Sequence, residues 1–342
     1  GLGKDCFPDI AVGTKQNLYL FNAGSIASAL LAKRRSYATM IDHTPEQEEL
    51  HVLEENEINA LLRALDGGFV YPGAGGSKED SPETGCNLYG VELDRIPTRE
   101  AYERGTQAAE DMIVRYLEEE GRYPEQIVLN MISLDIPRTK GEQFSLFLRL
   151  AGVRPCWNER GVVTGIELIA LEELKRPRMD VAAHISSVLR DTWPDILARM
   201  DETVLLAAMA DETPEDNYII RNLKADGRKC EAAQISRIFG NAPGVFASSI
   251  GLAIKASAWK DEKDLGRYFI DASSYAYGKD KYGEKDVTAF LNGIKRTDLT
   301  CDIMSLRHTD ALKNGYSSRI QGGYALAAKS LGLKRRIHSY MG

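Results

Sequence analysis

Residues after Thr98 alternate between apolar runs of strand length and amphipathic stretches of helix length, and this alternation limits the fold more than any other feature. Thr98 is a suitable N-cap for a helix that closes at Gly121, with Glu100 in its first turn. Strand candidates lie at 127–134, 162–171 and 179–185, and helix candidates at 141–151 and 187–209. Strands that alternate with helices in this way predict a parallel, doubly wound, Rossmann-like α/β sheet.

The regions on either side show other patterns of strand and helix candidates, which predicts three domains. Residues 1–97 form an N-terminal α/β segment, with strands expected at 9–12 and 17–20, helices at 25–37 and 46–65, and a glycine- and proline-rich loop at 67–85. Residues 98–210 form the doubly wound domain. Residues 211–342 are expected to be mainly helical, with helices around 230–239, 245–258, 261–277 and 286–293. The loop at 67–85 has no G-K-[ST] signature, so it is no Walker loop, and it is either a connector or a functional lid.

Composition excludes several classes of protein. The net charge is −7, so no global positive field attracts nucleic acid, and no run of 18 apolar residues is present to span a membrane. Five scattered cysteines without a C-x-x-C pair argue against a disulfide framework and suit a reducing cytoplasm. The five histidines form no local metal-binding motif.

Fixed charges crowd around the strand candidate at 179–185. Arg178 and Asp180 stand at its start, His184 lies within it, and Arg190-Asp191 follows it. Ligands bind beyond the carboxyl ends of strands in open parallel sheets, and arginine offers a planar fork of donors for carboxylates. The alternative is that each arginine forms a structural ion pair and that His184 is a core residue. Spacing leaves both interpretations open.

Five motifs in sequence order resemble those of one family. They are AKRRSYATMIDHTP, ETGCNLYGVELDRIPT, RTKGEQFSLFLRLAGVRPCW, KRPRMDVAAHISSVLRDTWPDILARMDETV and SRIFGNAPGVF. Together they resemble the large subunit of cobaltochelatase, CobN, and the related large, porphyrin-binding subunit of magnesium chelatase, and the resemblance covers nearly the whole chain.

The resemblance implies a protein that holds a tetrapyrrole bearing carboxylates, such as hydrogenobyrinate diamide or a porphyrin, while a divalent metal enters its ring. Cobalt, with magnesium as the alternative, would be the metal substrate in cobalamin biosynthesis, and separate AAA+ ATPase subunits would use ATP. The arginines expected to bind ring carboxylates are Arg138, Arg178 and Arg190, with Arg34 and Arg35 in the same wall. The residues expected to accept protons are Glu142, Asp191 and His43, and those expected to guide the metal are His43 and His184.

The resemblance has gaps. Family chains are several times longer, and the H-G-T…E segment that precedes the matched region in the family has no counterpart here, so we expect an internal piece of a larger polypeptide. The family's acidic D-S-D-D run is replaced by less acidic residues, and His184 stands where the family usually has no histidine. Two alternatives stay open: a tetrapyrrole-binding protein or inactive paralogue that inserts no metal, and an unrelated α/β enzyme that uses the 67–85 loop as a lid.

Overall fold

The structure is a computed structural model that describes residues 9–12, 19–22, 56–70, 75–76, 88–89, 92–133, 135–246, 249–303, 317–334 and 336–341. The chain divides into two compact units, Gly1–Val91 and Glu92–Gly342.

In the first unit, β1 (Asp9–Val12) pairs antiparallel with β2 (Tyr19–Asn22), and β3 (Gly75–Gly76) pairs parallel with β4 (Leu88–Tyr89). The strand predicted at 9–12 is confirmed, and the second strand begins two residues later than predicted. Residues 56–65 are helical, within the helix predicted at 46–65. The helix predicted at 25–37 and most of the 67–85 loop lie outside the described residues.

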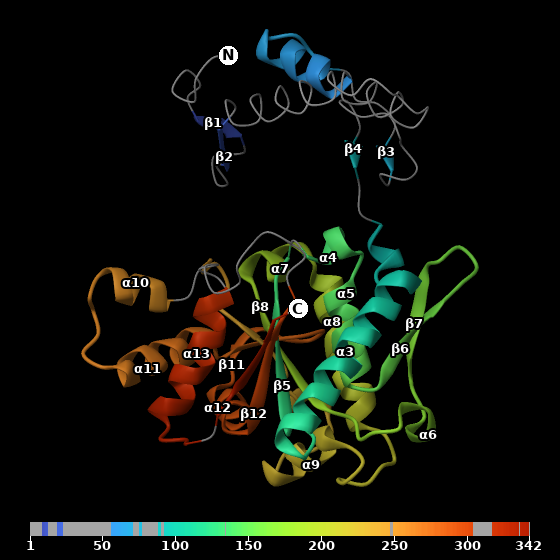
Figure 1. Ribbon diagram of the computed structural model, residues 1–342, viewed down its shortest axis with the longest axis vertical. Coiled ribbons are helices and arrows are strands. Elements are labelled where there is room, and N and C mark those ends of the chain that lie inside the picture. Colours follow the sequence, from blue (N-terminus) through green and yellow to red (C-terminus); the bar gives the residue numbers. More distant parts are fainter. Residues whose placement is uncertain are drawn as a thin grey trace. The chain divides into compact units, whose positions relative to one another are not determined.

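The second unit contains one seven-stranded sheet in the order β11-β10-β9-β8-β5-β12-β13 (Figure 1). The strands are β5 (Gln126–Met131), β8 (Asp180–Ile185), β9 (Ile238–Gly240), β10 (Tyr275–Tyr277), β11 (Tyr282–Lys285), β12 (Thr297–Asp302) and β13 (His338–Met341). The five neighbouring strands β9, β8, β5, β12 and β13 run parallel to one another. β10 pairs antiparallel with β9, and β11 pairs antiparallel with β10. The predicted α/β class with a mostly parallel sheet is confirmed. Because β5 and β8 come from 98–210 and the other strands from 211–342, both ranges share this sheet.

Helices cover both faces of the sheet (Figure 1). The helical elements of this unit are η2 (Leu93–Arg95), α3 (Arg99–Glu120), α4 (Asp135–Thr139), α5 (Glu142–Leu150), α6 (Leu171–Leu174), α7 (Ser187–Thr192), α8 (Pro194–Ala208), α9 (Tyr218–Ala225), η3 (Ala232–Gln234), α10 (Ser249–Lys255), α11 (Glu262–Ser273), α12 (Val287–Arg296) and α13 (Ser317–Ser330). One core lies under α3, α5, α8 and α9, and a second core lies under α10 to α13. Apolar area removed from water in these two layers is the main stabilising term of the fold.

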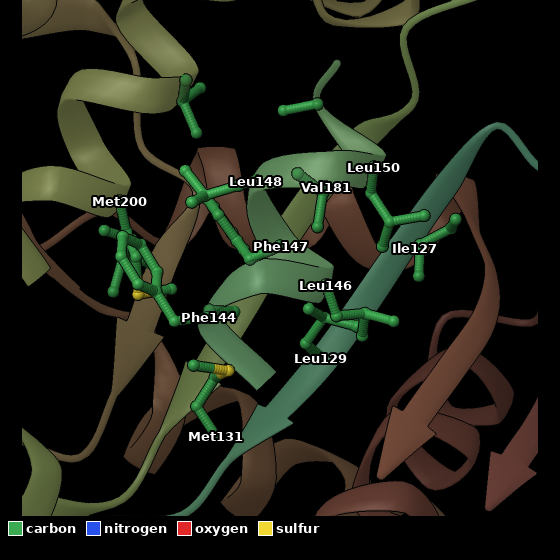
Figure 2. Packing of buried hydrophobic residues seen from close by; sticks show 14 of the residues in the cluster. Ile127, Leu129, Met131, Phe144, Leu146, Phe147, Leu148, Leu150, Val181 and Met200 are labelled. Carbon is green, nitrogen blue, oxygen red and sulfur yellow. The ribbon is translucent and has the colours of Figure 1, made fainter. Parts of the chain in front are cut away.

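The first core is built around α5, whose apolar residues face β5 and β8. Figure 2 shows Leu146 close to Leu129 of β5, and Phe144 on the other side of α5, close to Met200. Phe144 and Phe147 are completely buried. Because α3 precedes β5 and α5 follows it, this packing fixes the position of the chain that leaves the carboxyl end of β5.

Local signals explain several boundaries. The Thr98 hydroxyl accepts a hydrogen bond from the Ala101 amide at 3.2 Å, and Gly121 closes α3 in the left-handed conformation (φ 67°), as predicted. The helix predicted at 187–209 is two helices, because Pro194 provides no amide hydrogen and begins α8.

Other predictions need correction. The strand predicted at 162–171 exists as β7 (Val163–Leu168), but it pairs antiparallel with β6 (Val153–Trp157) outside the main sheet. The helix predicted around 230–239 is wrong, because the short turn η3 is followed by β9, whose buried Ile238 and Phe239 pair with β8. The helix predicted at 261–277 ends at Ser273, and its last residues form β10.

Candidate functional site

The order in which the chain adds strands to the sheet reverses at β5, so the switch point lies between β5 and β12. From β5 the chain adds β8 and β9 on one side, and later β12 and β13 on the other. In open α/β sheets, ligands bind beyond the carboxyl ends of the strands near such a switch point. The candidate site therefore consists of residues that follow β5, β8 and β9.

Hydrogen bonds hold the ends of β5 and β8 together. The Ser186 amide donates to the Met131 carbonyl at 3.0 Å, and the Ser133 amide donates to the Ser186 hydroxyl at 3.3 Å. Trp193 Nε1 donates to the Ser133 hydroxyl at 3.0 Å. The start of α7 is thereby fixed against the chain that leaves β5, so this edge of the sheet is rigid.

Arg190 lies on α7 with a side chain that is only 2% exposed. Its guanidinium binds the Asp191 carboxylate through two hydrogen bonds of 2.6 and 2.8 Å. Nη1 donates to the Ala242 carbonyl at 2.8 Å, in the loop that follows β9. The fork of Arg190 is thus committed to protein groups, and it joins α7 to that loop.

The Asp191 carboxylate points outward, with 54% of its side chain exposed. The hydrogen bonds from Arg190 lower the pKa of Asp191 below its ordinary value. A carboxylate held in this way stays charged and is a weak proton acceptor at neutral pH. Its chemistry suits attraction of a cation better than proton removal.

The loop after β9 presents apolar side chains to solvent. The Ser187 hydroxyl can donate a hydrogen bond to the carbonyl oxygen of Val245, at 2.7 Å, or of Phe246, at 3.0 Å. This contact fixes the backbone of the loop. Phe246 is 74% exposed and Val245 is 44% exposed, and Val188 on α7 is also exposed. The sequence predicted a helix at 245–258, whereas residues 245–246 belong to the loop and α10 begins at Ser249. The apolar pair directly after Pro243-Gly244 was the available signal.

Arg138 and Glu142 lie beyond the end of β5. Arg138 is exposed on α4, and Glu142 begins α5, half-buried, with an ion pair of 3.0 Å to Arg104. Figure 1 shows α4 and α7 at the same edge of the sheet. The fold therefore brings Arg138, Glu142, Arg190 and Asp191 to one edge.

Arg178 lies at the opposite end of β8, before its first residue. It is 1% exposed and its guanidinium binds the Glu212 carboxylate at 2.7 to 3.0 Å and the carbonyls of Gly152 and Ile169. A strand of six residues is about 20 Å long, so Arg178 does not share a site with Arg190. Its contacts are those of a structural ion pair.

His184 is a core residue on β8. Its ring stacks on Phe269 with centroids 5.6 Å apart and meets Tyr324 edge-on at 6.0 Å. Burial lowers the pKa of His184 to about 3, so the imidazole is neutral at physiological pH. His43, Arg34 and Arg35 lie outside the described residues.

Clusters of ionisable ligands and membrane-spanning helices are both absent from the described part of the chain. Among its residues, no three His, Cys, Asp or Glu side chains are grouped so that they alone would hold a metal ion. None of the helices in these described ranges combines the length and the apolar character needed to cross a bilayer.

A mostly parallel sheet with helices on both faces defines the class as a doubly wound α/β protein. The chain belongs to the CobN/magnesium chelatase family, whose model matches residues 1–49 and 46–342. The family predicted from the sequence motifs is thereby confirmed.

Relatives agree with this membership. The magnesium-chelatase H protein of Chlorobaculum parvum, a subunit of that enzyme, is 36% identical over 246 residues, 69% of this chain and 19% of that protein. Aerobic cobaltochelatase subunit CobN of Sinorhizobium sp is 31% identical over 292 residues, 81% of this chain and 23% of that protein. The catalytic subunit of cobaltochelatase from Mycobacterium tuberculosis superposes with a TM-score of 0.76 and 28% identity, covering 94% of this chain and 29% of that one. The chain thus spans about a fifth of the length of the two relatives compared by sequence.

Proposed function

We propose that this chain is a segment of the tetrapyrrole-binding large subunit of an ATP-dependent metal chelatase. The metal substrate is a divalent ion, cobalt with magnesium as the alternative, and the product belongs to cobalamin biosynthesis in the first case. Partner AAA+ subunits use the ATP. Family membership and the relatives' names support the reaction, and the few, scattered cysteines support a cytoplasmic location.

The observation that carries the proposal is the anchored apolar loop beside a locked carboxylate. A flat macrocycle needs apolar contact for its face, cations for its acidic side chains and an anion near the path of the metal. The 245–246 loop supplies the first, because its exposed side chains sit on a backbone fixed by Ser187 and Arg190. Rigid presentation lowers the ordering cost of binding.

We assign roles on this basis. Phe246 contacts the macrocycle face, and Arg138 binds a peripheral carboxylate. Asp191 attracts the incoming dication, and Arg190 positions both Asp191 and the loop. Glu142 remains the candidate proton acceptor at this end of the sheet. His43 stays a candidate that the sequence alone supports.

The test combines binding and turnover with the complete polypeptide, its ATPase partners and ATP. Tetrapyrrole binding is followed by the absorbance of the macrocycle, and insertion by its spectral change with Co²⁺ or Mg²⁺. Phe246→Ala should weaken tetrapyrrole binding about tenfold, equivalent to ~1.4 kcal/mol. Asp191→Asn should leave tetrapyrrole binding intact and slow insertion.

Met209→Ala is the matched control, because Met209 is 66% exposed but lies at the far end of α8. It should change neither measurement. No tetrapyrrole binding by the wild-type assembly would refute the proposed function. Binding without insertion of either metal would favour the tetrapyrrole-binding paralogue instead.

A further inference from the structure

Tyr282 is a large, exposed aromatic residue that packs on a rigid support. It begins β11, and 63% of its surface is exposed. Its ring meets the ring of Tyr277 on β10 edge-on, with the centroids 5.7 Å apart. Tyr277 is buried, and its hydroxyl donates to the Asn241 carbonyl at 2.5 Å. The exposed ring therefore packs on a buried ring that is itself bound to the loop after β9.

The hairpin of β10 and β11 also contacts this loop through its backbone. Gly283 has a φ of 78°, and a Cβ at this residue would lie 2.3 Å from Pro243 Cγ. Glycine suits both the left-handed conformation and the close approach. Pro243 comes shortly before Phe246 in the same loop. The segment that carries Tyr282 therefore lies directly against the segment that carries Phe246.

Both segments reach the same face of α7. The Phe246 carbonyl oxygen lies 3.0 Å from the Ser187 hydroxyl, and the Tyr282 hydroxyl lies 3.4 Å from Asp191 Oδ1. Ser187 and Asp191 are separated by one helical turn on α7, so their Cβ atoms lie on one face of the helix, ~5–6 Å apart. Two exposed aromatic residues thus approach one helix face from segments that are distant in the sequence.

The surroundings of Tyr282 indicate a site of interaction. A single exposed apolar side chain needs no explanation, but contiguous exposed apolar groups mark interaction sites. Tyr282 has such neighbours, because the adjoining loop exposes Val245 and Phe246. Its hydroxyl is only weakly held, since 3.4 Å is beyond the usual range for O–H···O hydrogen bonds. The ring is positioned by packing, so a ligand that covers it loses little free energy in ordering it.

We infer that Tyr282 is a second residue that contacts the face of the macrocycle, so that the ligand covers both the loop after β9 and the hairpin of β10 and β11. The inference rests on the proposed function, because it places the same ligand at the same end of the sheet. A tetrapyrrole macrocycle is wider than one helical turn of ~5.4 Å, so it can contact Tyr282 and Phe246 together. The pair therefore selects an extended planar ring system over a single aromatic ring.

The experiment measures binding of a porphyrin to the complete polypeptide by the absorbance of the macrocycle. Tyr282→Ala should weaken binding about fivefold, as expected for the loss of one aromatic contact. Tyr282→Phe keeps the ring and removes only the hydroxyl, so its affinity should match that of the wild type. When Tyr282→Ala and Phe246→Ala are combined, the loss should be close to the product of the two single losses, because each ring contacts its own part of the macrocycle.

Tyr268→Ala is the matched control. Tyr268 is an exposed tyrosine on α11, and its hydroxyl donates to the Ala258 carbonyl at 3.1 Å. Its replacement should leave porphyrin affinity unchanged. In the insertion assay with ATPase partners, ATP and Co²⁺ or Mg²⁺, Tyr282→Ala should raise the KM for the porphyrin and leave kcat unchanged. A variant that was partly unfolded would lose kcat instead.

The outcomes separate this inference from the proposed function. If Tyr282→Ala binds as tightly as the wild type while Phe246→Ala binds more weakly, the inference fails and the proposed function stands. A loss in Tyr282→Phe as large as that in Tyr282→Ala also overturns the inference, because the hydroxyl rather than the ring would then form the contact. If the wild-type polypeptide binds neither a porphyrin nor hydrogenobyrinate diamide, both proposals fail.

Discussion

Arg178 and Arg190 carry the same side chain at the two ends of one strand, yet their surroundings give them different tasks. Arg178 is enclosed by Glu212 and two backbone carbonyls, whereas Arg190 joins an exposed aspartate to a loop. The family resemblance grouped them as carboxylate-binding residues, because both lie within one matched motif. Only an arginine at the carboxyl end of the strand lies where ligands bind in such sheets. Sequence spacing does not show which acceptors surround a guanidinium.

Replacement of Arg178 tests this distinction. Arg178→Met leaves the Glu212 carboxylate without its main partner in a partly buried position, so we expect a loss of about 3–5 kcal/mol in the free energy of unfolding. Urea denaturation measures it. Arg138→Met removes an exposed guanidinium, so it should change the free energy of unfolding by no more than about 1 kcal/mol. Equal effects would show that Arg178 is not a structural residue.

Burial of His184 should make the free energy of unfolding depend on pH. Its folded pKa is about 3, against 6.5 for an ordinary histidine, so the unfolded chain binds the proton more readily between these values. The free energy of unfolding is therefore unaffected by His184 above pH 6.5 and falls as the pH drops toward 3. At pH 5 the loss is about 2 kcal/mol. Denaturation of wild type and His184→Phe at about pH 7.5 and about pH 5 should show a smaller loss in the variant.

At the scale of elements, the sequence predicted helices with clear caps and failed where pairing decided the structure. Thr98 and Gly121 bound α3 as expected, because cap chemistry is local. β9 is only three residues long and is stabilised by its place beside β8, so its local pattern did not distinguish it from a helix end. In the same way, the residues near the carboxyl edge were recognised from family motifs, but the anchored Phe246 loop depends on distant contacts.

The crossing of α11 and α13 gives a prediction at this scale. A Cβ on Gly266 would lie 2.4 Å from the Leu326 carbonyl oxygen, so Gly266→Ala forces the two helices apart. We expect a loss of about 1–3 kcal/mol. Gly322→Ala, within α13 and facing open space, should instead be neutral or stabilise by up to about 1 kcal/mol. Thermal unfolding of both variants provides the comparison, and a stable Gly266→Ala protein would contradict the close packing.

At the scale of the whole molecule, one sheet unites the ranges that the sequence divided at 210 and 211. β5 is flanked by β8 and β12, and β8 by β9, so removal of the later range exposes both sides of the central strand pair. Unpaired strand edges favour aggregation. A chain of residues 92–342 should unfold in a single transition, whereas residues 92–210 alone should not reach a folded state by circular dichroism and gel filtration. A monomeric, cooperatively folded 92–210 fragment would show two independent domains.

The saturated ion pair at one end of β8 has a consequence for how such proteins diversify. Arg178 and its acceptors hold the amino end of β8 in place. Substitutions around the carboxyl end can therefore change ligand recognition there without loss of the fold. Sequence differences that change pigment or metal preference among homologous chains should therefore lie mostly in the segments that leave the carboxyl ends of the strands. The strands themselves and the contacts of Arg178 should differ less.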